Sequence, residues 1–220
     1  YFGAINVFQQ YQARLVSVPV DRDGLRVDLL EPALQRYRPK FIYTLATYQN
    51  PSGALLSLER RRQLLEMAYR YRVPVVEDDI YRDLAYDVDP PPPLKGLDTA
   101  GFVIHVSSFS KVLCPGLRIG WVAAPSPVIR QLVRAKQFAD LHAPTLSQLL
   151  IERLVTSGAL AKHVEKLRAA YRTRRDAMGV ALRAEAPEGV SWVTPGGGFY
   201  FWCRLPAIAQ AALLARAAEE

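Results

Sequence analysis

A serine, a lysine and an arginine stand at fixed spacing in one turn of the chain. Lys111 lies three residues after Ser108 and seven before Arg118, in a segment that contains glycine and proline and joins two apolar stretches. A serine hydroxyl and an arginine guanidinium both suit a phosphate group. A lysine amine held near an aldehyde forms a Schiff base. Pyridoxal 5'-phosphate (PLP) carries both groups, so this segment indicates a PLP site.

Two further segments place polar side chains at the end of an apolar run. Asn50 lies in the turn Tyr48–Gly53, which follows the strand-like stretch Phe41–Leu45. Asp78 ends another apolar run, and Tyr81 comes three residues later. Each segment alone has an ordinary explanation, because such turns often join a strand to a helix and acids at a strand end often cap the next helix.

The three segments together favour one ligand site. They recur at intervals of about thirty residues, which is the spacing of βαβ units. In a parallel α/β sheet, loops of this kind gather at the carboxyl ends of the strands, where ligands bind. The sequence therefore predicts a crevice lined by Asn50, Asp78, Tyr81, Ser108, Lys111 and Arg118.

The elements that must position these residues alternate between strand and helix patterns. This alternation predicts an α/β fold with a mostly parallel sheet flanked by helices. A helix is predicted over Leu58–Tyr71, with Ser57 as its N-cap. The strand candidates are Arg14–Val18, Phe41–Leu45, Val73–Glu77, Phe102–Val106 and Ile119–Ala123.

The composition changes near Ser126, after which helix patterns dominate. A helix is predicted to open there, with Ser126 as its cap and Pro127 at its first position. A long helix should follow over Ala161–Glu185. Two strands, Val190–Val193 and Phe199–Arg204, should be joined through a glycine-rich turn, Gly196 to Gly198.

This change predicts two domains. Residues 1–125 would form part of the domain that binds the cofactor. Residues 126–220 would form a connecting helix and part of a smaller α+β domain. The chain begins without methionine and ends in an Ala-rich helical pattern, so we expect it to be a segment of a longer protein.

The chain resembles the PLP-dependent aminotransferases of class I/II. The resemblance rests on the Asn-Pro-x-Gly turn at Asn50, the Asp-x-x-Tyr step at Asp78 and the Ser-x-x-Lys run that leads to Arg118, in this order and spacing. It covers nearly all 220 residues and implies that residues 1–125 are the PLP-binding large domain of fold type I without its N-terminal part. Because the resemblance also implies parts of the site that this segment lacks, we expect the segment to be inactive on its own. The phrases Pro91–Asp98 and Asp140–Gln148 resemble a narrower group, which contains 2-aminoadipate-type aminotransferases and MocR/GntR-type regulators.

The resemblance implies a role for each candidate residue. Lys111 would hold PLP as an imine and, once freed, would move a proton as the catalytic base. Asp78 would pair with the protonated ring nitrogen and is preferred to Asp79 because it makes the three-residue step to the tyrosine. The remaining assignments are Asn50 and Tyr81 to the phenolic oxygen, and Ser108 and Arg118 to the phosphate.

These roles imply a transaminase that moves an amino group between an amino acid and a 2-oxo acid, acting as a homodimer. The alternative is the effector domain of a PLP-sensing regulator, which would contact DNA only through a domain upstream of Tyr1. A third interpretation is a PLP lyase or decarboxylase on the same scaffold. The identity of the substrate is not predicted.

Composition narrows the classes further. No apolar run approaches the length of about eighteen residues that a membrane span needs. The net charge of +7 raises nucleic acid as a partner. The arginine clusters Arg60–Arg62 and Arg172–Arg175 are predicted to be solvated helix faces, without direct DNA binding. Cys114 and Cys203 are predicted to be buried free thiols, which fits a cytoplasmic location. No Cys/His cluster shows metal-ligand spacing, so no metal is expected, and His105 is expected to be packed rather than catalytic.

Overall fold

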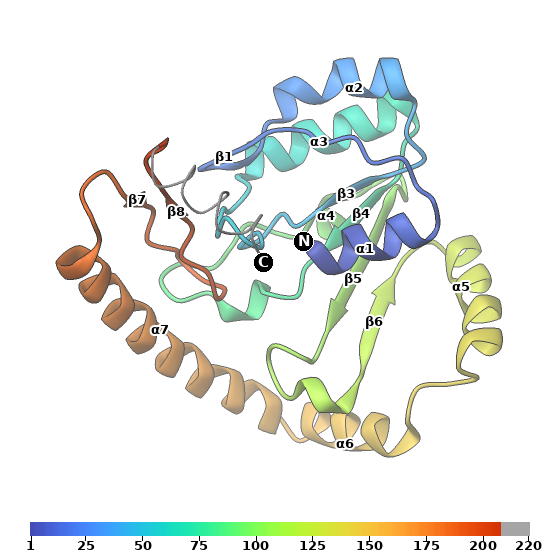
Figure 1. Cartoon of the computed structure of the whole chain (residues 1–220). Helices are drawn as coiled ribbons and strands as arrows, with labels where there is room; N and C mark the ends of the chain where they lie inside the picture. Colours follow the sequence, from blue (N-terminus) through green and yellow to red (C-terminus); the bar gives the residue numbers. More distant parts are fainter. Residues whose placement is uncertain (208–220) are drawn as a thin grey trace.

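A four-stranded sheet forms the centre of the computed structural model, which describes residues 1–207 (Figure 1). Its strands lie in the order β3 (Ile42–Thr44), β4 (Val75–Asp78), β5 (Val103–Ser108) and β6 (Gly120–Ala123). The first three strands are parallel, and β6 runs antiparallel to β5. The predicted α/β fold with a mostly parallel sheet is confirmed.

Helices flank this sheet and connect its strands. Two short hairpins stand apart from it, one formed by β1 (Val20–Asp21) with β2 (Gly24–Leu25) and one by β7 (Ser191–Trp192) with β8 (Cys203–Arg204). The α-helices are α1 (Phe2–Gln10), α2 (Leu30–Tyr37), α3 (Leu58–Tyr71), α4 (Leu94–Leu97), α5 (Ser126–Ala139), α6 (Thr145–Thr156) and α7 (Ala159–Glu185). Single 3-10 turns lie at Val27–Leu29, Arg82–Leu84 and Pro115–Leu117.

The main core lies between the sheet and the pair α2 and α3, which run side by side above it in Figure 1. Helix α3 has the predicted bounds because Ser57 caps it: the Ser57 Oγ accepts the N–H of Arg60 at 3.2 Å. The apolar face of α3 is buried against the sheet, and this burial supplies most of the stability of the helix. The buried core residues are Val27, Leu30, Leu34, Ile42, Ala46, Leu56, Leu64, Leu65, Ala68, Val73, Val75, Leu94 and Val103.

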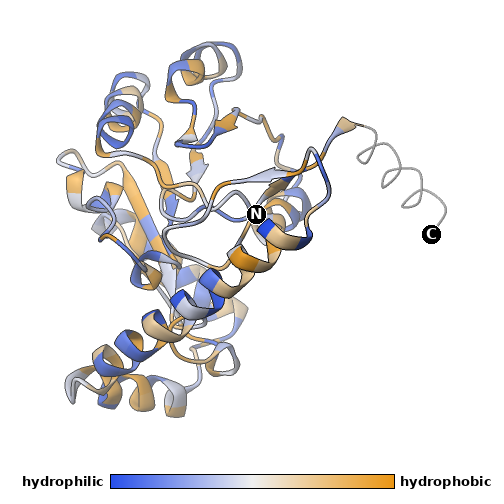
Figure 2. Ribbon diagram, turned by 90° about the vertical axis from the view of Figure 1, so that its left-hand side faces the viewer, coloured by the Kyte–Doolittle hydropathy of each residue, from blue (hydrophilic) through white to orange (hydrophobic). Residues whose placement is uncertain are grey.

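A second cluster lies under the loops that follow the strands. Tyr48, Tyr81 and Val112 are buried there, each from the loop after a different strand. The long helix α7, which carries both hydrophilic and hydrophobic residues in Figure 2, packs against this cluster through residues such as Leu167 and Tyr171. The three loops are therefore held together by apolar contacts at one end of the sheet.

Arg61 contradicts the prediction that its cluster is a solvated face. Its side chain is 0% exposed, whereas Arg62 is exposed. Arg61 occupies the core face of α3, since the buried positions after it, Leu64, Leu65 and Ala68, follow at three, four and seven residues. The wrong prediction came from reading the charges without the period of the helix.

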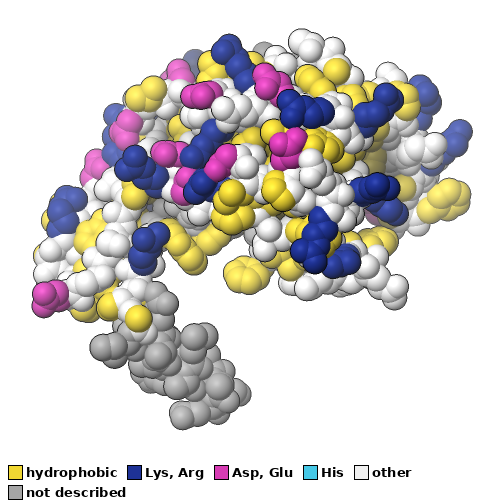
Figure 3. Space-filling model, turned by 90° about the horizontal axis from the view of Figure 1, so that it is seen from above, with side chains coloured by type: hydrophobic (Ala, Val, Ile, Leu, Met, Phe, Trp, Pro, Cys, Tyr) yellow, Lys and Arg dark blue, Asp and Glu magenta, His cyan; other side chains and the backbone are white. Residues whose placement is uncertain are grey.

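Arg60 is also held, by an ion pair with Asp21 of the β1–β2 hairpin at 2.7 Å. This guanidinium lowers the pKa of Asp21 to about 2. In Figure 3, Asp and Glu side chains are interspersed with Lys and Arg over much of the face seen from above. None of the described helices is long and apolar enough to cross a membrane.

Other predicted elements need correction. Arg14–Val18 forms no strand, and β8 is much shorter than the predicted Phe199–Arg204. Helix α5 starts at Ser126, but its cap residue is Pro125 and the serine side chain makes no capping bond. The long helix was predicted closely, since α7 covers Ala159–Glu185. The Ala-rich C-terminal pattern falls on residues 208–220, outside the described residues.

The two thiols are free, as predicted, but they are not buried. Cys114 is exposed and Cys203 is partly exposed. Cys114 immediately precedes the turn Pro115–Leu117, where the chain runs over the surface before β6. The apolar residues next to each cysteine in the sequence therefore did not predict the burial of its thiol correctly.

Candidate active site

Asp78 ends β4 with a buried carboxylate, 9% exposed. Tyr43, on the adjacent strand β3, donates its hydroxyl to the Asp78 Oδ2 at 2.7 Å. Burial raises the pKa of Asp78, and the bond from Tyr43 acts in the opposite direction. Within residues 1–207, no cationic side chain forms an ion pair with Asp78. A buried carboxylate with a neutral partner is suited to accept a cationic group from a ligand.

Asp79 is committed to a different partner. Its Oδ2 accepts the Nε of Arg82 at 2.6 Å, and Arg82 also donates to the carbonyl of Pro91 at 2.7 Å. The charge of Asp79 is therefore compensated inside the protein. This difference supports the choice of Asp78 over Asp79 as the ligand-facing acid.

Glu77 caps a helix, as the alternative explanation for the acidic run suggested. Its carboxylate accepts the backbone N–H groups of Leu94 and Lys95, at 2.7 and 3.0 Å, at the start of α4. The Nδ1 of His105 lies 2.8 Å from the Oε2 of Glu77, the oxygen that also accepts the N–H of Lys95. His105 is buried, as predicted. Glu77, Asp79 and His105 lie close enough together to consider a metal; Asp79 pairs with Arg82 and Glu77 with His105, while the buried Oδ1 of Asp79 has no hydrogen-bond partner within residues 1–207.

Asn50 and Tyr81 converge on a single oxygen atom. The Nδ2 of Asn50 donates to the hydroxyl of Tyr200 at 3.1 Å, and the Tyr81 hydroxyl lies 3.2 Å from the same oxygen. Two loops far apart in the sequence therefore share one hydrogen-bonding position, and a phenolic oxygen fits it. Burial raises the pKa of the Tyr81 hydroxyl, which keeps it protonated as a donor at neutral pH.

Tyr200 was not among the predicted site residues. It is positioned by the glycine-rich turn, which is bonded to the 3-10 turn after β4. The N–H of Tyr86 donates to the carbonyl of Gly196 at 2.8 Å, and the N–H of Gly198 donates to the carbonyl of Leu84 at 3.0 Å. The glycine run is thus the turn that was predicted. The signal that could have identified Tyr200 is its place directly after this turn.

Gly197 must be glycine for this contact to form. A Cβ there would lie 2.6 Å from the Leu84 carbonyl oxygen and closer still to the ring of Tyr48. A Cβ at Gly196 would meet only the Tyr48 ring, at an ordinary 3.9 Å. The close approach of the two chain segments depends on the absent side chain.

Ser108 and Lys111 lie at and just after the end of β5. The Ser108 Oγ accepts the N–H of Ser110 at 3.0 Å. The Lys111 side chain is partly exposed, and its amine makes no hydrogen bond or ion pair within residues 1–207. Its neighbour Val112 is buried in the same cluster as Tyr81, so the two loops lie together.

The Arg118 side chain does not contact Ser108. It is exposed, it has a left-handed backbone conformation with φ of 54°, and its Nη1 donates to the carbonyl of Pro115 at 3.1 Å. The backbone of the next residue, Ile119, returns to Ser108, whose Oγ lies 3.2 Å from the Ile119 carbonyl oxygen. The backbone at Ile119 therefore lies beside Ser108, while the Arg118 guanidinium bonds to the turn that precedes it, at Pro115.

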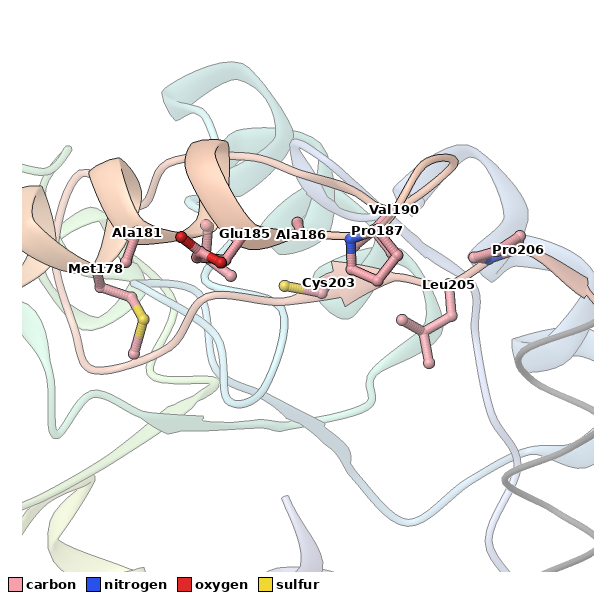
Figure 4. A pocket seen from close by; sticks show the side chains of 10 residues that line it. Met178, Ala181, Glu185, Ala186, Pro187, Val190, Cys203, Leu205 and Pro206 are labelled. Carbon is pink, nitrogen blue, oxygen red and sulfur yellow. The ribbon is translucent and has the colours of Figure 1, made fainter.

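A separate hollow of about 570 Å³ lies at the end of α7 (Figure 4). Its walls are largely apolar, with Met178 and Leu182 on the helix and Cys203 on β8. None of the candidate residues lines it. The convergence of polar side chains at the strand ends, rather than this hollow, defines the candidate site.

Comparison with known proteins identifies the family. Residues 1–220 match the family model of aminotransferase class I and II. The chain belongs to this family. Aromatic-amino-acid aminotransferase 1 of Thermococcus litoralis is 43% identical over 211 residues, which are 94% of this chain and 51% of the relative.

A solved structure within the same family gives the fold match. LysN, the alpha-aminoadipate aminotransferase of Thermus thermophilus, was solved with N-(5'-phosphopyridoxyl)-L-leucine. It superposes with a TM-score of 0.90 at 40% identity, over 94% of this chain and 54% of that one. The HTH-type transcriptional regulator YdfD of Bacillus subtilis is 37% identical over 99% of this chain and 45% of its own length. The chain spans about half the length of these relatives.

Proposed function

We propose that the protein carrying this chain is a PLP-dependent aminotransferase that transfers an amino group between an amino acid and a 2-oxo acid. Membership of the aminotransferase class I and II family supports this proposal. The relatives named above as aminotransferases act, by their names, on aromatic amino acids and on alpha-aminoadipate. A 2-oxo acid is the acceptor that any such amino transfer requires.

The observation that carries the proposal is the convergence of Asn50 and Tyr81 on one phenolic oxygen. The Tyr200 hydroxyl, which they contact at 3.1 and 3.2 Å, stands in for the ring oxygen of PLP. Asp78 supplies the second requirement, a buried carboxylate without a cationic partner in the described chain. PLP has both a phenolic oxygen and a ring nitrogen that can carry a proton, so these residues fit it.

Each residue then has a distinct task. When bound, PLP supplies an electron sink for the carbanion of the substrate. Asp78 would keep the ring nitrogen protonated, and Asn50 and Tyr81 would stabilise the phenolic oxygen as an anion. Lys111 would provide the primary amine that holds the aldehyde carbon. Once free and neutral, that amine would take the proton from the substrate Cα as a general base.

The phosphate would be held at the loop after β5. Ser108 offers a hydroxyl there, and Arg118 offers a guanidinium that now donates to the Pro115 carbonyl. An exposed arginine can exchange this neutral acceptor for a phosphate, because a charge-assisted pair of bonds is about twice as strong as neutral ones. Phosphate binding would therefore turn the Arg118 side chain inward.

Borohydride reduction of the protein expressed from its complete reading frame, with PLP added, tests this function. Peptide mass mapping should place the pyridoxyl group on Lys111. Lys111→Ala should abolish both the label and transamination. Lys136→Ala is a matched control, because Lys136 is exposed and pairs with Asp140 on its own helix. A label on Lys95 or Lys136 would contradict the assignment.

A second candidate function is suggested by the similarity to YdfD over 99% of the chain. In that case the domain would bind PLP through the same residues and regulate transcription through a DNA-binding domain elsewhere in the protein. An amino-donor screen with 2-oxoglutarate separates the two. Turnover with any amino acid supports the enzyme, whereas PLP binding without turnover, together with binding to its own promoter DNA, supports the regulator.

A further inference from the structure

Tyr43 contacts the carboxylate on which the proposed cofactor site depends. We propose that Tyr43 is a positioning residue, whose hydroxyl fixes the Asp78 carboxylate and keeps it charged, so that the proton stays on the ring nitrogen of the bound cofactor. This inference rests on the proposed function. It adds a residue that neither the motifs nor the family comparison assigns.

The register of the sheet places the two side chains together. Tyr43 on β3 pairs with Val76 on β4, and Asp78 follows Val76 by two residues. Because side chains alternate along a strand, Val76 and Asp78 project from the same face as Tyr43. The 2.7 Å bond between the Tyr43 hydroxyl and the Asp78 Oδ2 is the diagonal contact that this register allows.

The ring of Tyr43 is held from a third element. Phe8 of α1 packs edge-on against it, with ring centroids 5.5 Å apart and planes at 77°. Burial and the neighbouring Asp78 charge both raise the pKa of the Tyr43 hydroxyl. The phenol therefore remains protonated throughout the physiological range and acts toward Asp78 only as a donor.

Tyr43 bonds one carboxylate oxygen and leaves the other for a ligand. Within residues 1–207 the Asp78 Oδ2 has this bond, and no side chain or backbone N–H donates to the Oδ1. A donor that stabilises the charged form of an acid lowers its affinity for protons. A ring nitrogen facing Oδ1 would therefore keep its proton instead of passing it to the carboxylate.

Other charged groups face Asp78 but do not replace this bond. The ring of His105 on β5 favours the charged carboxylate, and Asp79 opposes it. These act only through space, whereas Tyr43 holds the carboxylate in one orientation. Orientation matters because the ion pair with a planar ring depends on the direction of the bond.

Tyr43→Phe tests the inference, because it removes the hydroxyl and keeps the ring against Phe8. In the protein from the complete reading frame, we expect the Kd for PLP to rise about tenfold. The ¹⁵N chemical shift of labelled PLP should move from the protonated toward the unprotonated value. Tyr71→Phe is the matched control, since it removes a hydroxyl that donates to Glu31 away from the site; it should change neither quantity.

A measurement without cofactor separates the two proposals. In the apo protein, ¹³C NMR should show a higher pKa for Asp78 in Tyr43→Phe than in the wild type. If the wild type binds no PLP, the proposed function fails, while this shift still reports on the contact between the two residues. If the wild type binds PLP and Tyr43→Phe leaves the Kd, the ¹⁵N shift and the Asp78 pKa unchanged, the positioning role is overturned and the proposed function stands.

Discussion

Two adjacent acids differ in their partners rather than in their burial. Asp78 is 9% exposed and Asp79 is 4% exposed, so burial alone would not separate them. Asp79 already has the guanidinium of Arg82, whereas the hydroxyl of Tyr43 is the one partner of the Asp78 carboxylate within residues 1–207. A cationic ring nitrogen would complete the charge balance at Asp78 alone.

Asp78→Asn should therefore reduce kcat/KM for the half-reaction with an amino acid by at least about a hundredfold. The lost ion pair in a buried site corresponds to about 3 kcal/mol or more. Asp79→Asn should cost stability through Arg82 but much less of kcat/KM in the protein that remains folded. Stopped-flow spectroscopy of the half-reaction checks both variants. Equal losses would show that the choice between the two acids is wrong.

Tyr200 occupies the position that the phenolic oxygen of the cofactor would need. In the proposed binding mode, PLP would break or rearrange the contacts of Tyr200 with Asn50 and Tyr81. Since each net hydrogen bond contributes about 0.5–1.5 kcal/mol, we expect Tyr200→Phe to tighten PLP binding by roughly threefold to tenfold. Fluorescence titration of the apo protein measures this. Weaker binding in Tyr200→Phe would mean that the hydroxyl stays beside the cofactor as a third donor.

At the level of elements, the glycine-rich turn connects the region after α7 to the loop after β4. Gly197 forms a bridge with Ala85, and the turn carries Tyr200 into the site. This contact allows no side chain at Gly197 but leaves room for one at Gly196. The two neighbouring glycines are therefore not equivalent.

Gly197→Ala should destabilise the protein by about 1–3 kcal/mol, because overpacking must push the turn away from the Leu84 carbonyl and the Tyr48 ring. The overpacking should also weaken PLP binding, because Tyr48 and Leu84, which it displaces, pack in the same cluster as Tyr81. Gly196→Ala is the matched control and should have a much smaller effect on both. Urea unfolding and PLP titration of the two variants provide the comparison. Similar losses from both would contradict the packing argument.

Arg61 joins four segments in the middle of the fold. Its Nε donates to the Leu56 carbonyl at 2.9 Å, and its Nη2 donates to the Ala46 carbonyl at 2.7 Å and the Thr47 Oγ1 at 3.0 Å. The buried carboxylate of Glu77 lies 3.7 Å from its Nη1. The arginine therefore compensates a buried charge and satisfies buried carbonyls.

Arg61→Met should lower the free energy of unfolding by about 3–5 kcal/mol, since it takes the guanidinium away from the buried Glu77 charge and leaves the Leu56 carbonyl without its donor. Arg62→Met, on the exposed face of the same helix, should change it by about 0.5 kcal/mol or less. Chemical unfolding followed by circular dichroism measures both. A small effect of Arg61→Met would show that the network does not contribute to stability.

The whole molecule exposes large apolar side chains on several helices. Phe2 on α1 is 80% exposed, Phe138 on α5 is 92% exposed and Leu146 on α6 is 80% exposed. Exposed apolar surface of this kind marks contacts with further protein. We propose that a second copy in a homodimer, or further parts of the same polypeptide, cover these helices in the active protein.

Residues 1–220 alone should therefore bind PLP weakly and turn over poorly compared with the product of the complete reading frame. Cofactor orientation depends on the full set of surrounding groups. PLP titration and a transamination assay on both proteins, with their masses in solution determined by light scattering, test this expectation. A kcat from the 220 residues equal to that of the complete product would show that they are a sufficient catalytic unit.

The predicted division of the chain into two domains at residue 125 stays a prediction.

The sequence by itself determined the four strands of the central sheet, the helix Leu58–Tyr71 and the three polar loops at the strand ends, although a fifth strand candidate, Arg14–Val18, was wrong. These features depend on local patterns, such as apolar runs, a serine cap and turn residues, which act over a few residues. The family followed from the same motifs, because Asn50, Asp78 and Lys111 stand in order within those loops.

The tertiary structure decided which side chains meet. Tyr43 and Tyr200 lie 35 and 150 residues from their partners Asp78 and Asn50, and no local pattern relates residues so far apart. Arg61 is buried because its helix face turns to the core, although its neighbour Arg62 with the same charge is exposed. Strand register and helix orientation fix these contacts, and both depend on the packing of the whole chain.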